Sequence, residues 1–251
     1  MLYGGHVRKI DDIQRLKDQG FDFGEVVLGD YESLLYWKLN GGRFDRKDGF
    51  FMLAHGPHEG NPNNIENLYK NYLPALKDTI LTLGQMGVDF LTIHMWMDSR
   101  HVLPEIIISK IAAFGEIQDF GKKEGITVSL ENLSESAVDF SRIIASIPDL
   151  SLTLDVGHGQ LLTDKNRSFE IIRHFRQSVK HVHIHDNRGG NGVRDDLHLP
   201  IGDGVIDFEG IFLALIESGY NGTITLELKP DELEASLEFT RKMVSHIINE
   251  K

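Results

Sequence analysis

The sequence contains no cysteine, and this absence removes several kinds of chemistry at once. Without cysteine the chain can form no disulfide, no thiolate nucleophile and no thiolate metal site, so any metal must be bound by nitrogen and oxygen. Long apolar runs are missing too, and none approaches the roughly 20 residues that a membrane-spanning helix needs. The N-terminal segment MLYGGHVRKI lacks the basic start and apolar stretch of a signal peptide. We therefore expect a protein outside the membrane, by default cytoplasmic.

Basic residues are in short supply. The chain has 26 lysines and arginines against 38 aspartates and glutamates, for a net charge of −12 with histidine neutral. No segment is rich in lysine or arginine, so a polyanion such as a nucleic acid would meet an unfavourable field. Hydrophobic residues make up 41% of the chain, which is enough for a sizeable core. The composition indicates a globular protein and weighs against a nucleic-acid partner.

Short apolar or β-branched segments alternate with amphipathic segments of helical period along the chain. The candidate strands lie near residue 3 and at residues 23–28, 50–55, 88–94, 126–132, 151–156, 180–186 and 223–228. The candidate helices lie at residues 10–20, 65–87, 104–125, 136–147, 169–179, 208–219 and 232–250, and loops are expected at residues 29–49 and 55–64. We therefore predict an α/β fold, a single (β/α)8 TIM barrel domain over residues 1–251, because such barrels have roughly 250 residues.

Polar and apolar side chains alternate within these strands. In FLTIH, Leu91 and Ile93 take one face, and Thr92 and His94 take the other. The aliphatic face of a barrel strand packs against the helices, so the polar face points inward and ends at the C-terminal mouth, where barrel enzymes place their chemistry. The residues that this pattern brings to the mouth are His55, His94, Glu131, Asp155, His183, His185 and Glu227, with His158 following Asp155.

This ring of imidazoles and carboxylates predicts a metal ion. A single histidine at a strand end is more often a hydrogen-bonded core residue than a ligand, but here such explanations would have to coincide on six strands. Burying many ionisable groups together is costly unless they are paired or bind a metal. Ligands of this kind suit Zn, Mn, Co or Fe, and carboxylate-rich sites also bind Mg. The surplus of ligands at an open mouth indicates a catalytic rather than a structural ion.

Several strings carry a family resemblance: SLENL, TLDVGHGQ, HVHIHDN, DLHLPIGDGVIDF and TLELKP, in this order and at these strand ends. Together with GFDFGEVVLGD at residues 20–30, they resemble the xylose-isomerase-like barrel superfamily. That superfamily includes sugar isomerases and epimerases, inosose-processing enzymes and endonuclease IV. The resemblance covers essentially the whole chain and implies an enzyme, but its motifs are shared by several reactions.

The epimerase branch implies one divalent cation with four ligands, matching Glu131, Asp155, His183 and Glu227. In similar sites the two glutamates also exchange protons with the sugar. Such chemistry needs a base at the carbon beside a carbonyl, a second acid/base group, and a cation that polarises the oxygens. The resemblance thus implies a metal-dependent isomerase or epimerase acting on a sugar or sugar phosphate. Similar barrels are often homo-oligomers.

Endonuclease IV gives the alternative, a phosphodiesterase with three zinc ions and a nucleic-acid substrate. Its ligand pattern implies a first group of His55, His94 and Glu131, and a second group of Glu131, Asp155, His183 and Glu227. The third group would be His158, Asp196 and His198. We prefer the small substrate, because DNA enzymes hold the phosphate backbone with basic residues, and the loops at 29–49 and 55–64 contain few of them.

The polar, glycine-rich segment 186–196 is expected to fold over the mouth. Its Arg188 and Arg194 either receive a phosphate or carboxylate or remain solvated on the surface. Lys229, on the inward face of the eighth strand, either reaches the substrate or pairs with a neighbouring acid. His185 is expected to orient a metal ligand or to contact the substrate.

The remaining histidines and aromatic residues are assigned to structure. His181 lies deeper on the seventh strand and is expected to be structural. Trp37, Trp96 and Phe51 can wall a pocket, although core packing is the simpler expectation for each. Surface or loop positions are expected for His6, His58, His101, His174 and His246.

Overall fold

Eight parallel strands close into a barrel in the computed structural model, which describes residues 1–44 and 49–250. Each strand pairs with the next along the chain, and the last pairs with the first. The predicted (β/α)8 TIM barrel is therefore confirmed. The strands are β1 (Leu2–Val7), β2 (Phe23–Val27), β3 (Phe51–His55), β4 (Phe90–His94), β5 (Thr127–Glu131), β6 (Ser151–Asp155), β7 (Val179–Ile184) and β8 (Thr223–Leu226).

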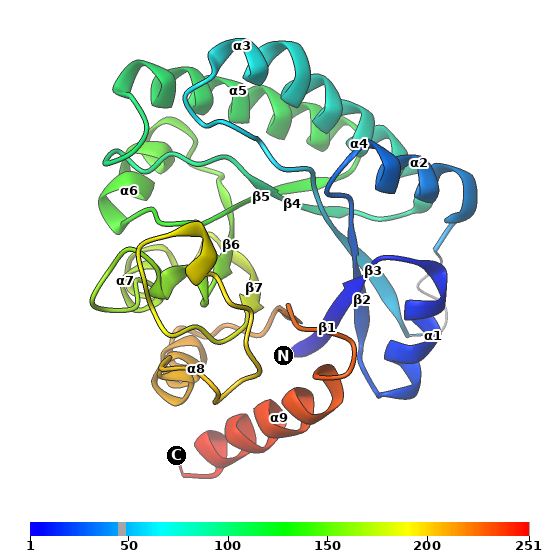
Figure 1. Ribbon diagram of the computed structural model, residues 1–251, viewed down its shortest axis with the longest axis vertical. Coiled ribbons are helices and arrows are strands. Elements are labelled where there is room, and N and C mark those ends of the chain that lie inside the picture. The colour runs from blue at the N-terminus through cyan, green and yellow to red at the C-terminus, as the bar shows by residue number, and fades with distance from the viewer. Residues whose placement is uncertain (45–48, 251) are drawn as a thin grey trace.

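Helices surround the barrel (Figure 1). They are α1 (Ile10–Asp18), α2 (Tyr31–Asn40), α3 (Ile65–Asn67) continued by a π-helical turn at Leu68–Tyr72, α4 (Leu73–Met86), α5 (Pro104–Lys123), α6 (Ala137–Ser146), α7 (Ser168–Phe175), α8 (Phe208–Glu217) and α9 (Leu233–Asn249). Short 3-10 turns lie at His158–Gln160 and Val193–Asp195. Each of the predicted helical segments contains a helix. Of the segment predicted as a loop at 29–49, residues 45–48 lie outside the described residues.

Helix α2 shows that assigning all of residues 29–49 to a loop was wrong. The side chain of Asp30 caps its N-terminus by accepting the backbone N–H of Ser33 at 2.7 Å. Trp37 is fully buried, but Leu39 is 74% exposed. Apolar residues therefore do not gather on one face of α2, and the periodicity that identifies an amphipathic helix is absent.

Side chains alternate in and out of the barrel as the sequence predicts. On β4, Leu91 and Ile93 belong to the hydrophobic core, whereas Thr92 Oγ1 lies 3.0 Å from Thr153 Oγ1. Thr153 Oγ1 also donates to Ser129 Oγ at 2.9 Å. These hydroxyl groups satisfy one another inside the barrel. They form a polar layer beneath the ionisable residues at the mouth.

The strand register brings acidic and histidine residues to the same height. His94 of β4 is in register with Glu131 of β5, and Asp155 of β6 is in register with His183 of β7. All these strands are parallel, so their C-terminal residues meet at one end of the barrel. The four side chains are therefore carried by strands rather than loops, which fixes their relative positions.

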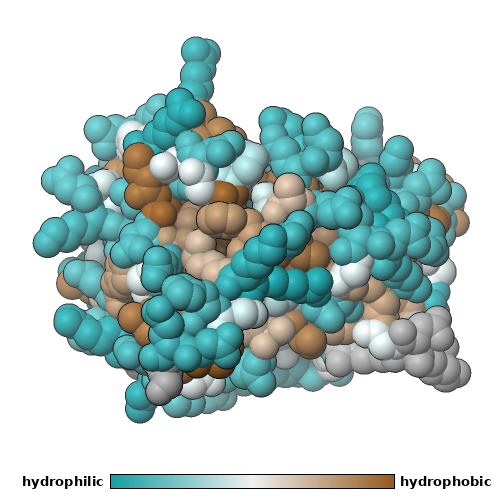
Figure 2. Space-filling model, turned by 90° about the horizontal axis from the view of Figure 1, so that it is seen from below, coloured by the Kyte–Doolittle hydropathy of each residue, from teal (hydrophilic) through white to brown (hydrophobic). Residues whose placement is uncertain are grey.

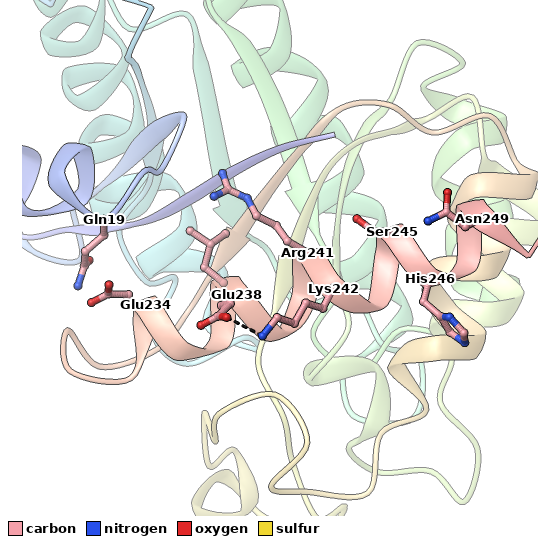
Figure 3. Close-up of a pocket in the computed structure, with 9 residues that line it drawn as sticks. Gln19, Glu234, Glu238, Arg241, Lys242, Ser245, His246 and Asn249 are labelled. Carbon is pink, nitrogen blue, oxygen red and sulfur yellow. Dashed lines mark ion pairs between the residues drawn. The ribbon is translucent and has the colours of Figure 1, made fainter.

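The outer surface is largely hydrophilic in the view of Figure 2, with apolar patches scattered between polar side chains. Among the described residues, no helix is long and apolar enough to cross a bilayer. A groove of about 580 Å³ runs along α9 (Figure 3). Its charged side chains pair locally, with Lys242 Nζ 2.5 Å from Glu238 Oε1. The residues that line this groove include none of the predicted site residues, so the groove is not part of the candidate site.

Candidate metal centre

Glu131 lies at the centre of a cluster of ionisable side chains at the C-terminal mouth of the barrel. This cluster, Glu131 with the imidazoles around it, is called the hub. The Glu131 side chain is buried, and Oε2 lies 3.1 Å from His55 Nε2 and 3.0 Å from His94 Nε2. The other oxygen, Oε1, lies 3.2 Å from His158 Nδ1 and 3.4 Å from His183 Nδ1. One carboxylate thus meets four imidazoles from four segments of the chain. The predicted group of His55, His94 and Glu131 is brought together with ligand atoms within 4.8 Å of one another.

His183 joins the remaining carboxylates to this hub. Its Nδ1 lies 3.1 Å from Glu227 Oε1, 3.4 Å from Glu131 Oε1 and 3.9 Å from Asp155 Oδ2. The two glutamates end or follow strands β5 and β8, so they approach His183 from different parts of the mouth. The four ligands predicted for a single cation therefore converge around one ring nitrogen.

Three atoms of this group test whether a cation fits. Glu131 Oε1, Asp155 Oδ2 and His183 Nδ1 are all buried, and none of them makes a hydrogen bond. A buried polar atom without a partner costs about 1–3 kcal/mol, and more when it is charged. His183 Nδ1 lies 3.4 Å from Glu131 Oε1 and 3.9 Å from Asp155 Oδ2, and one ligand atom from each of the three residues lies within 4.8 Å of the other two. A divalent cation bound by carboxylate oxygen and imidazole nitrogen would satisfy all three.

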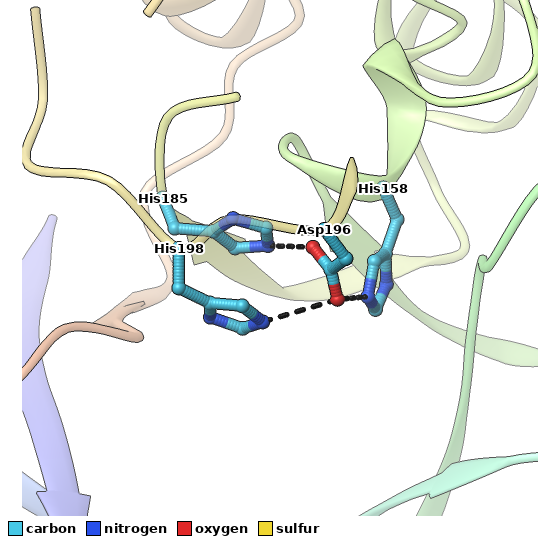
Figure 4. A group of neighbouring side chains, drawn as sticks. All are labelled: His158, His185, Asp196 and His198. Atoms are coloured by element: carbon cyan, nitrogen blue, oxygen red, sulfur yellow. Dashed lines mark hydrogen bonds and ion pairs between the residues drawn. The ribbon is translucent and has the colours of Figure 1, made fainter. Parts of the chain in front are cut away.

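A further group of potential ligands lies beside the hub (Figure 4). Asp196 Oδ2 lies 3.3 Å from His158 Nε2 and 3.2 Å from His198 Nε2. Asp196 Oδ1 lies 3.9 Å from His185 Nε2. His158, Asp196 and His198 were predicted to act together, and they are neighbours. His185, predicted to support a ligand or contact substrate, is a member of the same group.

The position of His198 involves a strained backbone. Its φ is 46°, in the left-handed region that residues other than glycine rarely adopt. The ring stacks on His185 with centroids 3.8 Å apart. Burial lowers the pKa of His198, but the hydrogen bond to Asp196 and the charge of Glu227 outweigh it and raise the pKa to about 9. The strained backbone at His198 thus places its ring within hydrogen-bonding distance of Asp196.

Burial and charge oppose each other at the hub. Burial acts to raise the pKa of Glu131, but the positive charges of His94 and His183 outweigh it and hold the pKa well below its usual range. The pKa of Glu227 is lowered in the same way, against burial, by His183 and His6. Both carboxyl groups are therefore held in the ionised form, which is the form that binds a cation.

His6 was predicted to lie in a surface or loop position, and this prediction was wrong. It belongs to β1, and its Nε2 lies 2.9 Å from Glu227 Oε1. The candidate strand near residue 3 was read too short, because Gly4 and Gly5 interrupt the alternation of polar and apolar side chains. A strand that continues to Val7 carries His6 into the mouth.

Glu25 is a candidate that the sequence analysis missed. It lies in the middle of β2, fully buried, with Oε2 3.1 Å from His183 Nε2 and 3.2 Å from His181 Nε2. His181 Nδ1 in turn lies 2.7 Å from Thr223 Oγ1, in agreement with the structural role predicted for it. The signal was present in the sequence, because a single glutamate inside the apolar string FGEVVL needs a partner once it is buried.

A cavity of about 420 Å³ adjoins the ligand group at His158 and Asp196. Trp96 forms part of its wall, whereas Trp37 is fully buried in the core and Phe51 stacks on another phenylalanine at 5.2 Å. The lining combines apolar side chains with the potential ligands His158 and Asp196, as small-molecule sites commonly do. The lining residues are Trp96, His101, Leu133, Ser134, His158, Leu161, Leu162, Asn191, Gly192 and Asp196.

The predicted basic substrate contacts lie at the surface. Arg188 and Arg194 are exposed in the segment between β7 and α8. Lys229 Nζ lies 3.2 Å from Glu232 Oε1, and the Lys229 side chain is 74% exposed. Of the two roles considered for Lys229, the ion pair is the one observed. Of the histidines predicted to lie in surface or loop positions, His58, His101, His174 and His246 are exposed, whereas His6 is not.

Comparison with known proteins identifies proteins whose sequences are related to this chain. Residues 13–243 match the family model described as xylose isomerase-like TIM barrel. An uncharacterized protein of Methanocaldococcus jannaschii is 27% identical over 261 residues, which cover 95% of this chain and 85% of that protein. An inosose dehydratase of Lacticaseibacillus casei is 32% identical over 103 residues, covering 36% of this chain and 34% of the dehydratase. The likeness to the dehydratase is thus confined to about a third of each chain.

Solved structures share the fold over the whole chain. A D-tagatose 3-epimerase-like protein superimposes with a TM-score of 0.82 at 23% identity, covering 100% of this chain and 99% of that chain. The IOLI protein, solved with a bound zinc atom, superimposes with a TM-score of 0.74 at 16% identity, covering 100% and 99%. At such identities the likeness establishes the barrel and leaves the reaction to be argued from the site.

Proposed function

We propose a function for this chain, which belongs to the xylose isomerase-like TIM barrel family: it is a divalent-metal-dependent isomerase or epimerase of a sugar or sugar phosphate. The observation that carries the proposal is the convergence of Glu131 Oε1, Asp155 Oδ2 and His183 Nδ1, three buried atoms without hydrogen-bond partners. Glu227 completes the set at 3.1 Å from His183 Nδ1. These four residues would hold one ion, with Zn, Mn, Co or Mg compatible with the donors.

The bound ion would polarise the carbonyl and hydroxyl oxygens of the substrate as negative charge develops on them. Glu131 and Glu227 supply the proton transfers. One carboxylate removes the proton from the carbon beside the carbonyl, and the electron pair of that bond moves toward the carbonyl oxygen. The other glutamate takes up a proton from solvent beforehand and gives it to the opposite face of the same carbon, or to the carbonyl carbon while the proton of the neighbouring hydroxyl group moves to the carbonyl oxygen. The first outcome is epimerisation and the second is isomerisation. The first glutamate afterwards releases to solvent the proton that it removed.

The two glutamates lie in different surroundings, which suits them to different roles in proton transfer. Glu131 is contacted by three further imidazoles. Glu227 meets His6 at the same Oε1 that faces His183, and its Oε2 lies 3.6 Å from His198 Nδ1. Their environments therefore differ, and groups with different environments can take different roles in proton transfer. The adjoining cavity of about 420 Å³ is large enough for a monosaccharide, and its apolar wall at Trp96 suits the carbon face of a sugar ring.

The relatives' names support the same class of substrate. They include a D-tagatose 3-epimerase-like protein, an L-ribulose 3-epimerase and inosose dehydratases. The zinc atom in the IOLI structure supports a divalent ion in a barrel of this fold. As candidate substrate contacts we keep His185, Arg188 and Arg194, the arginines being suited to a phosphate or carboxylate group. Lys229 would have to leave its ion pair with Glu232 to act in the same way.

The test begins with the metal content of protein purified without chelator, followed by a panel of ketoses and sugar phosphates. We expect about one ion per chain and turnover of at least one sugar. Glu131→Gln and Glu227→Gln should each lower kcat by roughly 10²- to 10⁴-fold, the usual contribution of general acid–base catalysis. Glu234→Gln, at an exposed glutamate of α9, is the matched control and should leave activity unchanged. Full turnover in either site variant would exclude the assignment.

A second function is favoured by one specific observation. Besides the four ligands of the proposed single ion, the mouth contains two further groups of potential ligands. One is His55 and His94, which share Glu131 with the first site, and the other is His158, Asp196 and His198. This set suits an endonuclease IV-like phosphodiesterase with three zinc ions, an AP endonuclease. Close to three zinc ions per chain and cleavage of abasic DNA would establish it. The cavity lining weighs against it, because the residues that line it include no lysine or arginine to hold a phosphate backbone.

A further inference from the structure

His183 is held between carboxylates on both sides of its ring. On one side, Nε2 lies 3.1 Å from Glu25 Oε2 and 3.2 Å from Glu25 Oε1. On the other side, Nδ1 lies 3.1 Å from Glu227 Oε1 and 3.4 Å from Glu131 Oε1. All of these groups are buried. A neutral imidazole has a single N–H, so the two sides compete for one proton.

The directions of the contacts decide this competition. The Nε2 contacts with Glu25 have hydrogen-bond geometry. The Nδ1 atom lies close to Glu227 and Glu131, yet it has no hydrogen-bond partner among the described residues. A proton on Nε2 therefore gains a charge-assisted hydrogen bond, and a proton on Nδ1 gains none.

Glu25 also contacts a second histidine, His181, which lies deeper in the barrel than His183. Its Oε2 lies 3.2 Å from His181 Nε2, and His181 Nε2 lies 3.1 Å from Thr225 Oγ1. The opposite ring nitrogen of His181 lies 2.7 Å from Thr223 Oγ1. The carboxylate thus sits at the end of a chain of contacts that runs along β7 and β8. Among the described residues its hydrogen-bond partners are the two imidazoles, and it is not one of the residues that line the cavity.

We propose that Glu25 is a positioning residue for the metal centre: it accepts the Nε2–H of His183 and thereby presents the Nδ1 lone pair to the cation. The inference rests on the proposed function in so far as that function requires a cation at His183. A carboxylate that accepts the second N–H of a metal-bound histidine fixes the tautomer, the ring orientation and the basicity of the ligand. Without Glu25, the ring proton could move to Nδ1 beside Glu227, where it would block the metal.

The first experiment needs no variant. In uniformly ¹⁵N-labelled wild-type protein loaded with Zn²⁺, the imidazole ¹H–¹⁵N spectrum reports which nitrogen of His183 carries the proton. We expect a slowly exchanging, downfield-shifted proton on Nε2 and a metal-shifted Nδ1. A proton on Nδ1 with zinc on Nε2 would overturn the proposal, as would a rapidly exchanging Nε2 proton, because a proton held by a buried carboxylate exchanges slowly.

The second experiment measures Co²⁺ affinity from its visible absorption. Glu25→Leu removes the acceptor, and we expect the affinity to fall by roughly 10- to 100-fold, the usual effect of losing a partner of a metal-bound histidine. Glu25→Gln keeps the volume and an acceptor oxygen but loses the charge, so its loss should be smaller. Glu135→Gln is the matched control, a second buried carboxyl group that contacts no histidine in the structure. It should leave Co²⁺ affinity unchanged.

These outcomes separate the two proposals. If wild-type protein binds neither Zn²⁺ nor Co²⁺ at His183, the metal-dependent function fails and Glu25 has no such role. If wild-type protein binds the ion but folded Glu25→Leu binds it equally well, the role of Glu25 fails and the proposed function stands. Should Glu25→Leu not fold, as far-ultraviolet circular dichroism would reveal, the wild-type proton assignment and Glu25→Gln decide the question.

Discussion

Removing the ammonium group of Lys110 should destabilise the protein strongly, because it leaves a buried carboxylate without its partner. Lys110 lies in α5 with its side chain 1% exposed, and Nζ is 2.5 Å from Glu59 Oε1. Nζ also donates to the backbone carbonyl of Trp96 at 2.7 Å, and Glu59 Oε2 accepts the backbone N–H of Trp96 at 3.0 Å. The ion pair therefore binds both the backbone carbonyl and the backbone N–H of Trp96, a residue that lines the cavity.

The magnitude follows from this burial. Breaking a buried pair from one side costs about 3–5 kcal/mol, because the remaining charge loses its partner and cannot be resolvated. Lys110→Met should therefore lower the free energy of unfolding by about that amount. In the double variant with Glu59→Gln, no charge is left behind and the amide oxygen can still accept the N–H of Trp96. Its loss should be only about 1–2 kcal/mol, since isosteric neutral replacement of buried pairs is often nearly neutral.

Urea unfolding of the wild type, both single variants and the double variant completes the cycle. The double variant should be more stable than Lys110→Met alone by about 2–3 kcal/mol. The coupling energy is obtained by also subtracting the loss measured for Glu59→Gln alone. Lys122→Met is the control, because that residue is also in α5 but its ion pair with Asp149 has side chains 52% and 77% exposed; it should cost less than about 1 kcal/mol. A loss below about 1 kcal/mol for Lys110→Met, or strictly additive losses, would refute the reasoning.

Two more predictions concern the loops around the mouth. Burial raises the pKa of Glu135 from 4.5 to about 7, so the folded state binds this proton more tightly than the unfolded state. The contribution of Glu135 to the free energy of unfolding of chelator-treated protein should then fall by about 3 kcal/mol as the pH rises from about 4.5 to 7. It is measured as the difference between wild type and Glu135→Gln in urea unfolding, and equal slopes for the two would contradict this. Gly157→Ala would place a Cβ 2.1 Å from His185 Cε1, and that ring stacks on His198 and cannot retreat. Thermal unfolding should show a loss of about 1–3 kcal/mol, whereas Gly115→Ala, with its nearest contact at 4.0 Å, should be neutral or stabilising.

The barrel and most of its mouth could be predicted because the alternation of side chains is unusually regular. Strand β4 shows why: Leu91 and Ile93 enter the core, and Thr92 and His94 line the interior. A period of two in several consecutive βα units fixes both the fold and the inward face. Once the inward face is known, the last inward residue of each strand must lie at the mouth. Glu131 was predictable for this reason alone.

The residues that escaped prediction lack this local signal. Gly4 and Gly5 hide the alternation of β1, and Gly4 is required there because a Cβ would lie 2.2 Å from the ring of Phe23. His6 was therefore not seen as part of a strand. Glu25 lies within a strand rather than at its end, and its partner His183 is 158 residues away. No pattern within one segment of sequence can reveal a contact of that kind.

The charge balance of the mouth gives a physical reason for a cation that is independent of any relative. Buried carboxylates at Glu131 and Glu227 can be balanced by protons on the surrounding imidazoles. Burial alone lowers the pKa of His158 and His183, but neighbouring carboxylates, Asp155 and Glu25 foremost, hold both pKa values well above the usual range. An imidazole that binds a metal must be neutral, so a cation entering the hub displaces these protons. One divalent ion then balances the charge that several protons balanced before. The strands already hold the ligand atoms within 4.8 Å of one another, so folding has already desolvated the carboxylates and this part of the binding cost does not arise again when the cation enters.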